Sequence, residues 1–342
     1  MSSDHPIESI EVAEPSVHHV QVDPEDDPWG GLMGDGGYPT DVDSYATSLS
    51  SSVLDYKWLN GRRFHAYKEG SYKFPNDERE QSRLDMMHCI FKLAMGGELF
   101  LAPVDVEQPL RVLDIGTGTG IWALEVGDQF PNIKMIIGND LSPIQPDLVP
   151  PNVVFEVDDV EAEWPPREQF DLIHARYMCG SIKDWPKLFR QAYEQTRDGG
   201  WIEFQEFHLV NYSQDGTLTE DNNVNKFYKL LAEACDRMGR PVTVGAELPD
   251  YAAAAGFRNI HHRVYPLPLG PWPMNKRMKE TGALNMIQFL EGLEAFSVAT
   301  FTHILGWSPE AVQLFLAEVR ADAMRKDVHM MHNFHVVYAQ KL

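Results

Sequence analysis

The sequence predicts an α/β protein with a doubly wound sheet that is mostly parallel and has an antiparallel last strand. Five short apolar runs between residues 109 and 210 alternate with helical patterns, as strands and helices do in parallel sheets with right-handed crossovers. The first run, Leu110–Ile115, leads directly into a glycine-rich turn and then into a helix. Apolar runs near the end of the chain supply the antiparallel strand.

Residues 1–50 are expected to form a disordered acidic tail. They contain eleven acids and no Lys or Arg, which accounts for half of the net charge of −22. With few large apolar side chains, the segment cannot bury enough surface to offset the entropy cost of ordering. A solvated spacer is the favoured interpretation, and a partner-binding tail is the alternative.

Residues 51–108 are predicted to form an N-terminal cap of aromatic residues and one helix. Six aromatic residues lie near its start: Tyr56, Trp58, Phe64, Tyr67, Tyr72 and Phe74. Asp77 followed by Glu80 predicts a helix N-terminus, after which apolar residues recur at helical spacing. The ionic residues Arg83, Asp85 and His88 are interpreted as a solvated or interdomain face, with the border of a cofactor pocket as the alternative.

Residues 109–210 form the predicted ligand-binding core. Three glycines alternate in the turn after the first strand: Gly116, Gly118 and Gly120. They let backbone N–H groups approach a ligand closely. A dinucleotide fingerprint would require Gly at position 121, where the chain has Ile. The second strand, 133–140, ends in Asp140, whose carboxylate is well placed to accept hydrogen bonds from both hydroxyls of a ribose.

The remaining core strands are predicted over 153–157, 170–176 and 201–206. A helix over 184–197 and a turn at 198–200 precede the last of these strands. Because ligands bind at the carboxyl ends of parallel strands, residues that are far apart in sequence are expected along one edge. These residues are Gly116 to Gly120, Asp140, Asp159, Arg176 and Glu206.

Residues 211–325 are predicted to form a helical lid or substrate layer that includes strand six, and residues 326–342 carry the final strand. Helices are expected over 224–238, around 278–293 and after Ser308, where Ser is the cap and Pro occupies the first turn. The last two strands, 259–264 and 334–339, are expected to close the sheet as an antiparallel edge pair.

The composition argues against several classes of protein. The 29 Lys and Arg against 51 Asp and Glu disfavour direct binding of nucleic acid, which needs a basic footprint. Cys89, Cys179 and Cys235 lack the spacing of a zinc site or a disulfide framework, so no metal is expected. No apolar run approaches the roughly 18 residues of a membrane span, and no signal peptide is evident. We therefore expect a cytoplasmic protein, with the nucleus as the alternative location.

Several stretches together resemble one family. Asp114 and the three glycines after it form Asp-x-Gly-x-Gly-x-Gly, which resembles motif I of the class I methyltransferases that depend on S-adenosylmethionine (SAM). The segment Ser142-Pro143-Ile144-Gln145-Pro146 is more discriminating. Further stretches are 60–62, 75–78, 83–85, 198–201, 270–273 and 305–308. From about residue 54 to the end, the chain is similar to the LaeA-like methyltransferases of filamentous fungi.

This resemblance implies the Rossmann-like fold of class I methyltransferases and SAM as the cofactor. The family includes enzymes that methylate small molecules in secondary-metabolite pathways and a nuclear regulator that binds velvet proteins. We therefore expect a methyltransferase that acts on an oxygen or carboxylate of a small molecule. A regulator in a protein complex is the alternative, and its partner would contact the acidic tail or the lid.

The expected cofactor-binding residues follow the ends of the strands. They are Asp114, Gly116, Thr117, Gly118, Gly120, Asp140, Leu141, Asp158, Asp159, Val160 and Arg176. In methyltransferases that this chain resembles, an acid after the third strand binds the adenine amino group, and Asp159 fits that role slightly better than Asp158. Arg176 has two interpretations, a partner for a carboxylate of substrate or cofactor and a structural ion pair.

Methyl transfer from a sulfonium is an in-line displacement, so alignment and exclusion of water can supply much of the catalysis. A base is needed only for an acceptor that arrives protonated. His208 and His174 are the candidate bases, because histidine titrates near pH 6.5, and a structural role is the alternative for each. Tyr177 and Trp272 are expected to line an apolar acceptor pocket or else to belong to the core.

Overall fold

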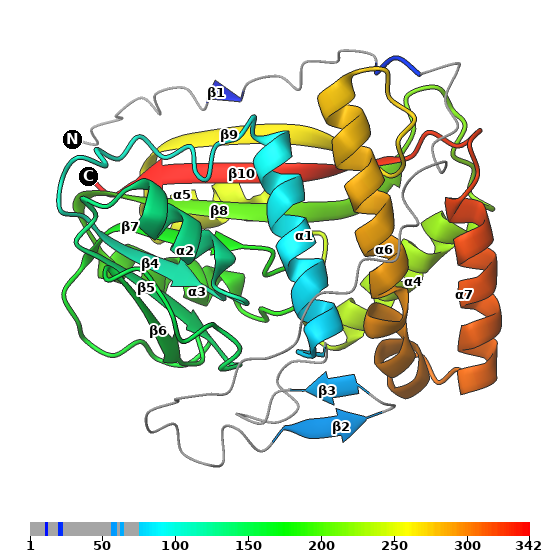
Figure 1. Cartoon of the computed structure of the whole chain (residues 1–342), viewed down its shortest axis with the longest axis horizontal. Helices are drawn as coiled ribbons and strands as arrows, with labels where there is room; N and C mark the ends of the chain where they lie inside the picture. Colours follow the sequence, from blue (N-terminus) through cyan, green and yellow to red (C-terminus); the bar gives the residue numbers. More distant parts are fainter. Residues whose placement is uncertain (1–10, 13–19, 23–55, 60–61, 65–74) are drawn as a thin grey trace, which may run out of the picture.

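An eight-stranded sheet with helices on both faces forms the centre of the protein (Figure 1). The structure is a computed structural model that describes residues 11–12, 20–22, 56–59, 62–64 and 75–342. The strands are β1 (Glu11–Val12), β2 (Lys57–Leu59), β3 (Arg62–Phe64), β4 (Arg111–Ile115), β5 (Met135–Asp140), β6 (Val153–Val157), β7 (Phe170–Arg176), β8 (Thr196–Tyr212), β9 (Arg258–Pro268) and β10 (Met331–Gln340). The helices are α1 (Glu78–Ala94), α2 (Ile121–Gln129), α3 (Trp185–Gln195), α4 (Asn223–Arg237), η1 (Gly245–Glu247), α5 (Leu248–Ala255), α6 (Lys276–His303) and α7 (Pro309–Ala323).

The sheet has the order β1-β9-β10-β8-β7-β4-β5-β6, while β2 and β3 form a separate pair. Strands β6, β5, β4, β7 and β8 are parallel, and β10 lies antiparallel between β8 and β9. Four of the five residues of β4 are buried, as expected for a central strand that is covered on both faces. The predicted fold, a mostly parallel doubly wound sheet with an antiparallel last strand, is confirmed.

Strand boundaries follow the predictions closely in the parallel half and less closely beyond it. The predicted strands 153–157 and 170–176 match β6 and β7 residue for residue. Strand β8 is longer than predicted because the expected turn at 198–200 continues the ladder, where the Gly199 N–H donates to the Lys341 carbonyl at 2.7 Å. Strands β9 and β10 also extend beyond their predicted ends because they pair along their whole length.

Helix α1 crosses the sheet in front of β8 and β10 and packs against α6 (Figure 1). As predicted, Asp77 caps it, and a carboxylate oxygen accepts from the Glu80 N–H at 3.1 Å. Arg83 and His88 are each 3% exposed, so the interpretation of a solvated face is wrong for them. Both instead contact segments outside the predicted cap, in agreement with the interdomain interpretation, and His88 Nε2 lies 2.5 Å from Glu125 Oε2 of α2. Arg83 is buried because Glu80 pairs with it at 2.7 Å and Gln288 of α6 accepts from its Nη1 at 3.0 Å.

Helices α4, α6 and α7 form a layer at one end of the molecule with an apolar cluster of its own (Figure 1). The ring of Phe227 on α4 lies 5.6 Å from that of Phe289 and 5.7 Å from that of Phe301, both on α6. Helix α6 continues ten residues past the predicted end at Leu293 because its apolar face extends to Phe301 and packs on α7. The sequence prediction missed the short helix α5.

The predicted disordered tail is described in part. Glu11–Val12 forms β1, which pairs with β9, and the Val20 N–H donates to Gln214 Oε1 at 2.8 Å. These two pieces contact the folded body, so the prediction of a solvated tail is wrong for them. Apart from 11–12 and 20–22, residues 1–50 lie outside the described residues, as do Tyr67, Tyr72 and Phe74 of the predicted aromatic cap.

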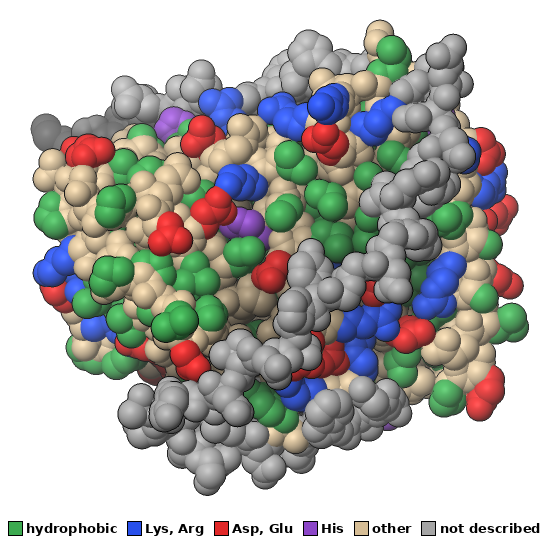
Figure 2. All heavy atoms as spheres, in the orientation of Figure 1, with side chains coloured by type: hydrophobic (Ala, Val, Ile, Leu, Met, Phe, Trp, Pro, Cys, Tyr) green, Lys and Arg blue, Asp and Glu red, His purple; other side chains and the backbone are tan. Residues whose placement is uncertain are grey.

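Figure 2 shows the face of the molecule that carries α1 and α6. Lys and Arg side chains gather along its upper edge, and acidic side chains are scattered among apolar ones elsewhere on the face. No helix in the described part of the chain is long and apolar enough to cross a membrane.

Candidate active site

The turn between β4 and α2 lies at the edge of a pocket. Gly116 and Gly118 have φ angles of +64° and +58°, a left-handed conformation that favours glycine. Gly116 also has no room for a side chain, because a Cβ there would lie 2.1 Å from Met178 Sδ. At Gly118 the nearest described atom to such a Cβ would be Leu84 Cδ1, at 3.7 Å. The backbone of this turn is therefore open to close approach by a ligand.

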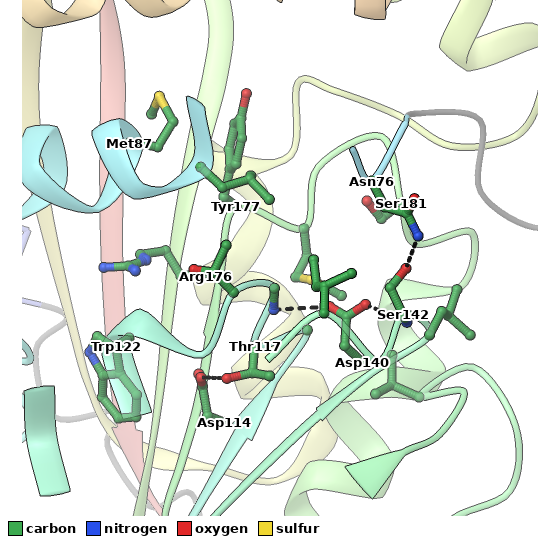
Figure 3. Close-up of a pocket in the computed structure, with 18 of the residues that line it drawn as sticks. Asn76, Met87, Asp114, Thr117, Trp122, Asp140, Ser142, Arg176, Tyr177 and Ser181 are labelled. Carbon is green, nitrogen blue, oxygen red and sulfur yellow. Dashed lines mark hydrogen bonds between the residues drawn. The ribbon is translucent and has the colours of Figure 1, made fainter. Parts of the chain in front are cut away.

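Asp114 holds this turn in place. Its Oδ2 accepts from Thr117 Oγ1 at 2.6 Å (Figure 3). Its Oδ1 accepts from His174 Nδ1 at 2.7 Å. His174 is fully buried and stacks on Trp122, with ring centroids 3.7 Å apart. Asp114 lines the pocket, whereas His174 lies behind it in the core. The structure thus places His174 where it positions Asp114 rather than where it meets an acceptor.

Asp140 ends β5 beside the same turn. Its Oδ2 accepts from the Gly118 N–H at 3.0 Å, and its Oδ1 accepts from the Ser142 N–H at 2.9 Å (Figure 3). These bonds fix the carboxylate at the wall of the pocket. An ionised carboxylate has about four lone-pair sites, so it can accept from ligand hydroxyls as well as from backbone N–H groups.

The segment 142–146 braces the glycine turn from outside. Gln145 Nε2 donates to the Gly118 carbonyl at 2.6 Å. Asn76 Nδ2 donates to Ser142 Oγ at 3.1 Å (Figure 3). This segment therefore ties the start of α1 to the turn. Ser142 and Ile144 of this segment line the pocket, as does Leu141 just before it.

The residues after β6 line the pocket next to Asp140. The Asp158 N–H donates to the Asp140 carbonyl at 3.0 Å, and Asp158 Oδ1 accepts from the Asp159 N–H at 2.8 Å. Asp159 Oδ1 accepts from the Glu161 N–H at 2.9 Å. Asp158, Asp159 and Val160 all line the pocket, as expected for residues that contact an adenine ring.

Arg176 brings a positive charge to the pocket from the end of β7. Its Nη2 donates to His88 Nδ1 at 3.0 Å, so the proton of the neutral imidazole is on Nε2, which donates to Glu125 Oε2 at 2.5 Å. Burial, aided by the charge of Arg176, lowers the pKa of His88 to about 4, and burial lowers the pKa of Arg176 to about 10. At neutral pH the guanidinium is therefore a cation beside a neutral ring. Arg176 makes no ion pair with any described residue.

These residues surround one pocket with a cavity of about 140 Å³. Every predicted cofactor-binding residue lines it except Gly120, which is the N-cap of α2. A Cβ at Gly120 would lie 2.4 Å from the ring of Phe155, so this glycine serves packing. His88 of α1 lines the pocket, as the alternative interpretation of that residue predicted, but the sequence prediction missed the apolar wall that α1 contributes with Leu84, Met87 and Phe91. Their helical spacing was visible, but the spacing does not show that this face covers a ligand.

Tyr177 follows β7 and lines the pocket as predicted. Its φ of +59° is unusual for a side chain of this size, which indicates a constrained segment. Glu206 provides the constraint, because its carboxylate accepts from the N–H groups of Met178 (2.6 Å) and Cys179 (3.0 Å). Burial raises the pKa of Glu206 to about 8, and burial raises the pKa of Tyr177 to about 12.

Two predicted residues lie elsewhere. Side chains alternate between the faces of a strand, and the ring of His208 lies on the face of β8 opposite Phe207, 5.7 Å from the ring of His335. Trp272 packs beside His329, with ring centroids 5.0 Å apart. Neither His208 nor Trp272 lines the pocket. The geometry therefore gives no support to His208 as a base or to Trp272 as a wall of the acceptor site.

The strand order and this pocket define the class of protein. A glycine turn after β4, an acid at the end of β5 and acids after β6 meet at the carboxyl edge of a sheet whose last strand is antiparallel, which is the arrangement of a class I methyltransferase. The polar groups fit SAM: carboxylates that can accept hydrogen bonds from ribose hydroxyls and an adenine amino group, and a guanidinium that can donate to a carboxylate. Within the described ranges, no group of three or more His, Cys, Asp or Glu is placed to hold a metal.

Comparisons with known proteins agree with this class of protein. A family model described as a methyltransferase domain matches residues 73–262. The chain is 50% identical over 301 residues to methyltransferase pytC of Aspergillus terreus, covering 88% of this chain and 93% of that one. It is 37% identical to the secondary metabolism regulator LAE1 of Cochliobolus heterostrophus (82% and 94% covered) and 34% identical to the protein-methionine methyltransferase laeA of Emericella nidulans (82% and 75%). The chain belongs to the LaeA-like family and is a SAM-dependent methyltransferase.

Proposed function

We propose that this methyltransferase transfers the methyl group of SAM to an oxygen of a small-molecule acceptor. The observation that carries the proposal is the partly enclosed pocket between the glycine turn and α1, in which one wall is polar and fixed and the other is apolar. Such a pocket is suited to a small ligand, since apolar walls with a few placed polar groups are typical of small-molecule sites.

In this proposal the polar wall holds the cofactor. Asp140 accepts hydrogen bonds from the ribose hydroxyls, and Asp159 accepts from the adenine amino group. Arg176 binds the carboxylate of the methionine part of SAM. This last assignment is supported by the neutral state of His88, because a partly buried cation beside a neutral ring is stabilised by an anionic ligand.

The bound sulfonium supplies an electrophilic methyl group and leaves as a neutral thioether. The chain's own contribution is alignment and exclusion of water, for which Met87, Phe91 and Tyr177 provide the cover. His88 is the one histidine among the described residues that line the pocket, and it is not a suitable base near neutral pH, because it is held between Arg176 and Glu125 with a pKa of about 4. The acceptor oxygen is therefore one that ionises readily by itself, as in a carboxylic acid, an enol or an acidic phenol.

The test is turnover with methyl-labelled SAM and a panel of carboxylic acids, enols, phenols and aliphatic alcohols, read by mass spectrometry. We expect methylated products from the first three groups and none from the aliphatic alcohols, which need a base. Asp140→Ala should abolish turnover, whereas Asp147→Ala, at an exposed residue seven positions later, should leave it unchanged. Efficient methylation of aliphatic alcohols, with no methylation of the other three groups, would contradict the proposal.

A regulator that acts in a protein complex remains the second candidate, because a 37% identical relative is named as a regulator of secondary metabolism. In that case we propose the acidic segment 1–50 or the layer of α4, α6 and α7 as the contact with the partner. The two functions differ in their dependence on the cofactor. A host strain that carries Asp140→Ala loses its phenotype if the protein acts as an enzyme and keeps it if complex formation alone matters.

A further inference from the structure

A second cavity of about 50 Å³ adjoins the cofactor pocket. The two share Tyr177 and Ser181 as lining residues, so they meet at the segment after β7. Figure 3 shows the ring of Tyr177 directed away from Asp140 and Ser142. The second cavity therefore extends the site away from the wall assigned to the ribose.

His332 of β10 is the unusual member of the second cavity. It is fully buried, and within the described part of the chain neither of its ring nitrogens has a hydrogen-bond partner. Its ring packs against Phe207, with centroids 5.0 Å apart and planes at 85°, and lies 6.1 Å from the ring of Tyr228. A buried polar side chain without a partner calls for an explanation such as a ligand or bound water.

The strand that faces His332 is irregular. Met331 pairs with Tyr212 and Asn333 with His208, so residues 209–211 of β8 lie opposite His332 alone, whereas the pairing of β10 with β9 is regular there. Bulges are common beside active sites. Leu209 of this bulge lines the cavity together with His332, so the irregular part of β8 lies at the cavity wall.

The rest of the cavity offers a neutral lining. Arg83 is its charged member, but Glu80 pairs with its Nη2 at 2.7 Å, and its Nη1 donates to Tyr177 Oη (3.2 Å) and to Gln288 Oε1 (3.0 Å). Burial raises the pKa of the Cys179 thiol, which is therefore neutral at pH 7. Burial lowers the pKa of His332 to about 4, so this side chain is also neutral at pH 7. Its ring therefore offers one N–H donor and one acceptor nitrogen.

We propose that this cavity receives the buried end of the methyl acceptor and that His332 hydrogen-bonds a neutral hydroxyl or carbonyl there. The inference rests on the proposed function, and it adds a substrate feature to it. The cavity is smaller than the roughly 150 Å³ that takes a benzene molecule, so it admits a polar atom and its immediate neighbours but not a whole ring. The reacting oxygen is therefore a different one, on the Tyr177 side toward SAM.

The experiment uses the full chain saturated with S-adenosylhomocysteine and two probes, phenol and benzene, which differ by one hydroxyl. The hydroxyl is the part that should enter the cavity, while the ring of either probe stays on the Tyr177 side. Binding is followed by NMR of protein labelled with ¹⁵N-histidine, in which the His332 signals are assigned from their absence in His332→Phe. We expect phenol to shift these signals and to bind about tenfold more weakly to His332→Phe, a typical loss for one hydrogen bond. Benzene should bind both proteins equally, and His332→Gln should restore part of the phenol affinity.

His303→Phe, at an exposed histidine at the end of α6, is the matched control and should bind phenol as the wild type does. An equal loss of affinity for phenol and for benzene in His332→Phe would overturn the inference, because it would reflect packing alone. Phenol binding that does not shift the His332 signals would also overturn the inference and would indicate that water occupies the cavity. Failure of the wild type to bind S-adenosylhomocysteine would instead refute the proposed function, so the two failures are distinguishable.

Discussion

Replacing Gly118 with Ala tests whether the turn after β4 faces the cofactor. At φ +58° an alanine costs about 1–2 kcal/mol of backbone strain. The added methyl would meet Leu84 Cδ1 at 3.7 Å, an ordinary contact, so no packing cost is added and the protein should stay folded. Because Gly118 and Leu84 both line the pocket, the methyl takes space from the ligand. We expect affinity for S-adenosylhomocysteine to fall at least tenfold, about 1.4 kcal/mol.

Gly216→Ala is the matched control. Gly216 has φ +76°, no described atom lies within 4 Å of a Cβ placed there, and it does not line the pocket. Both variants should lose a similar free energy of unfolding in urea titrations, whereas calorimetry should show lost affinity in Gly118→Ala alone. Equal affinity of the two variants for S-adenosylhomocysteine would refute the assignment of this turn to the cofactor.

Three further predictions concern single side chains. Arg176→Gln should reduce the preference for S-adenosylhomocysteine over methylthioadenosine, which lacks the carboxylate, by about 10- to 100-fold in calorimetry. Hydrogen bonds to charged groups contribute about 1.5–3 kcal/mol, which sets this range. An unchanged preference would show that Arg176 does not bind the carboxylate. Because burial raises the pKa of Glu206 to about 8, the folded state disfavours its ionisation, and the free energy of unfolding should fall from pH 6.5 to 8 by up to about 1.4 kcal/mol per pH unit. Urea titrations of Glu206→Gln should show a smaller fall, and an identical slope would contradict the assigned pKa. Asp77→Ala should lower the free energy of unfolding by about 1–2 kcal/mol, because Asp77 caps α1 and pairs with Arg62 at 2.5 Å. Asp147→Ala, at an exposed site, should leave the free energy of unfolding unchanged.

The parallel half of the sheet could be predicted from the sequence because local patterns determine it. Strands β6 and β7 are apolar runs with clear polar ends, and the acid that ends β5 is visible in the sequence itself. The edge of a parallel sheet then brings Asp140 and Asp159 together without any knowledge of long-range contacts. For the same reason the predicted cofactor wall agrees with the lining of the pocket.

The surroundings of Arg176 and the acceptor side could not be predicted because they depend on contacts between distant segments. His88 meets Arg176 across 88 positions of the chain, and neither side chain alone indicates that the other is near. The strand alternation does place Phe207 and His208 on opposite faces, but only the packing of α1 shows that the face of Phe207 borders the site. His332 likewise gains its significance from the cavity that it lines together with residues of other segments, which no periodicity in the sequence indicates.

The most direct test of the central claim is calorimetric titration of the full chain with SAM and S-adenosylhomocysteine, beside Asp140→Ala and Asp147→Ala. The account predicts one site per chain in the wild type, retained affinity in Asp147→Ala, and a loss of at least tenfold in a folded Asp140→Ala, since two ribose hydrogen bonds to a charged group are removed. Wild-type affinity in Asp140→Ala, or no binding by the folded wild type, would contradict it.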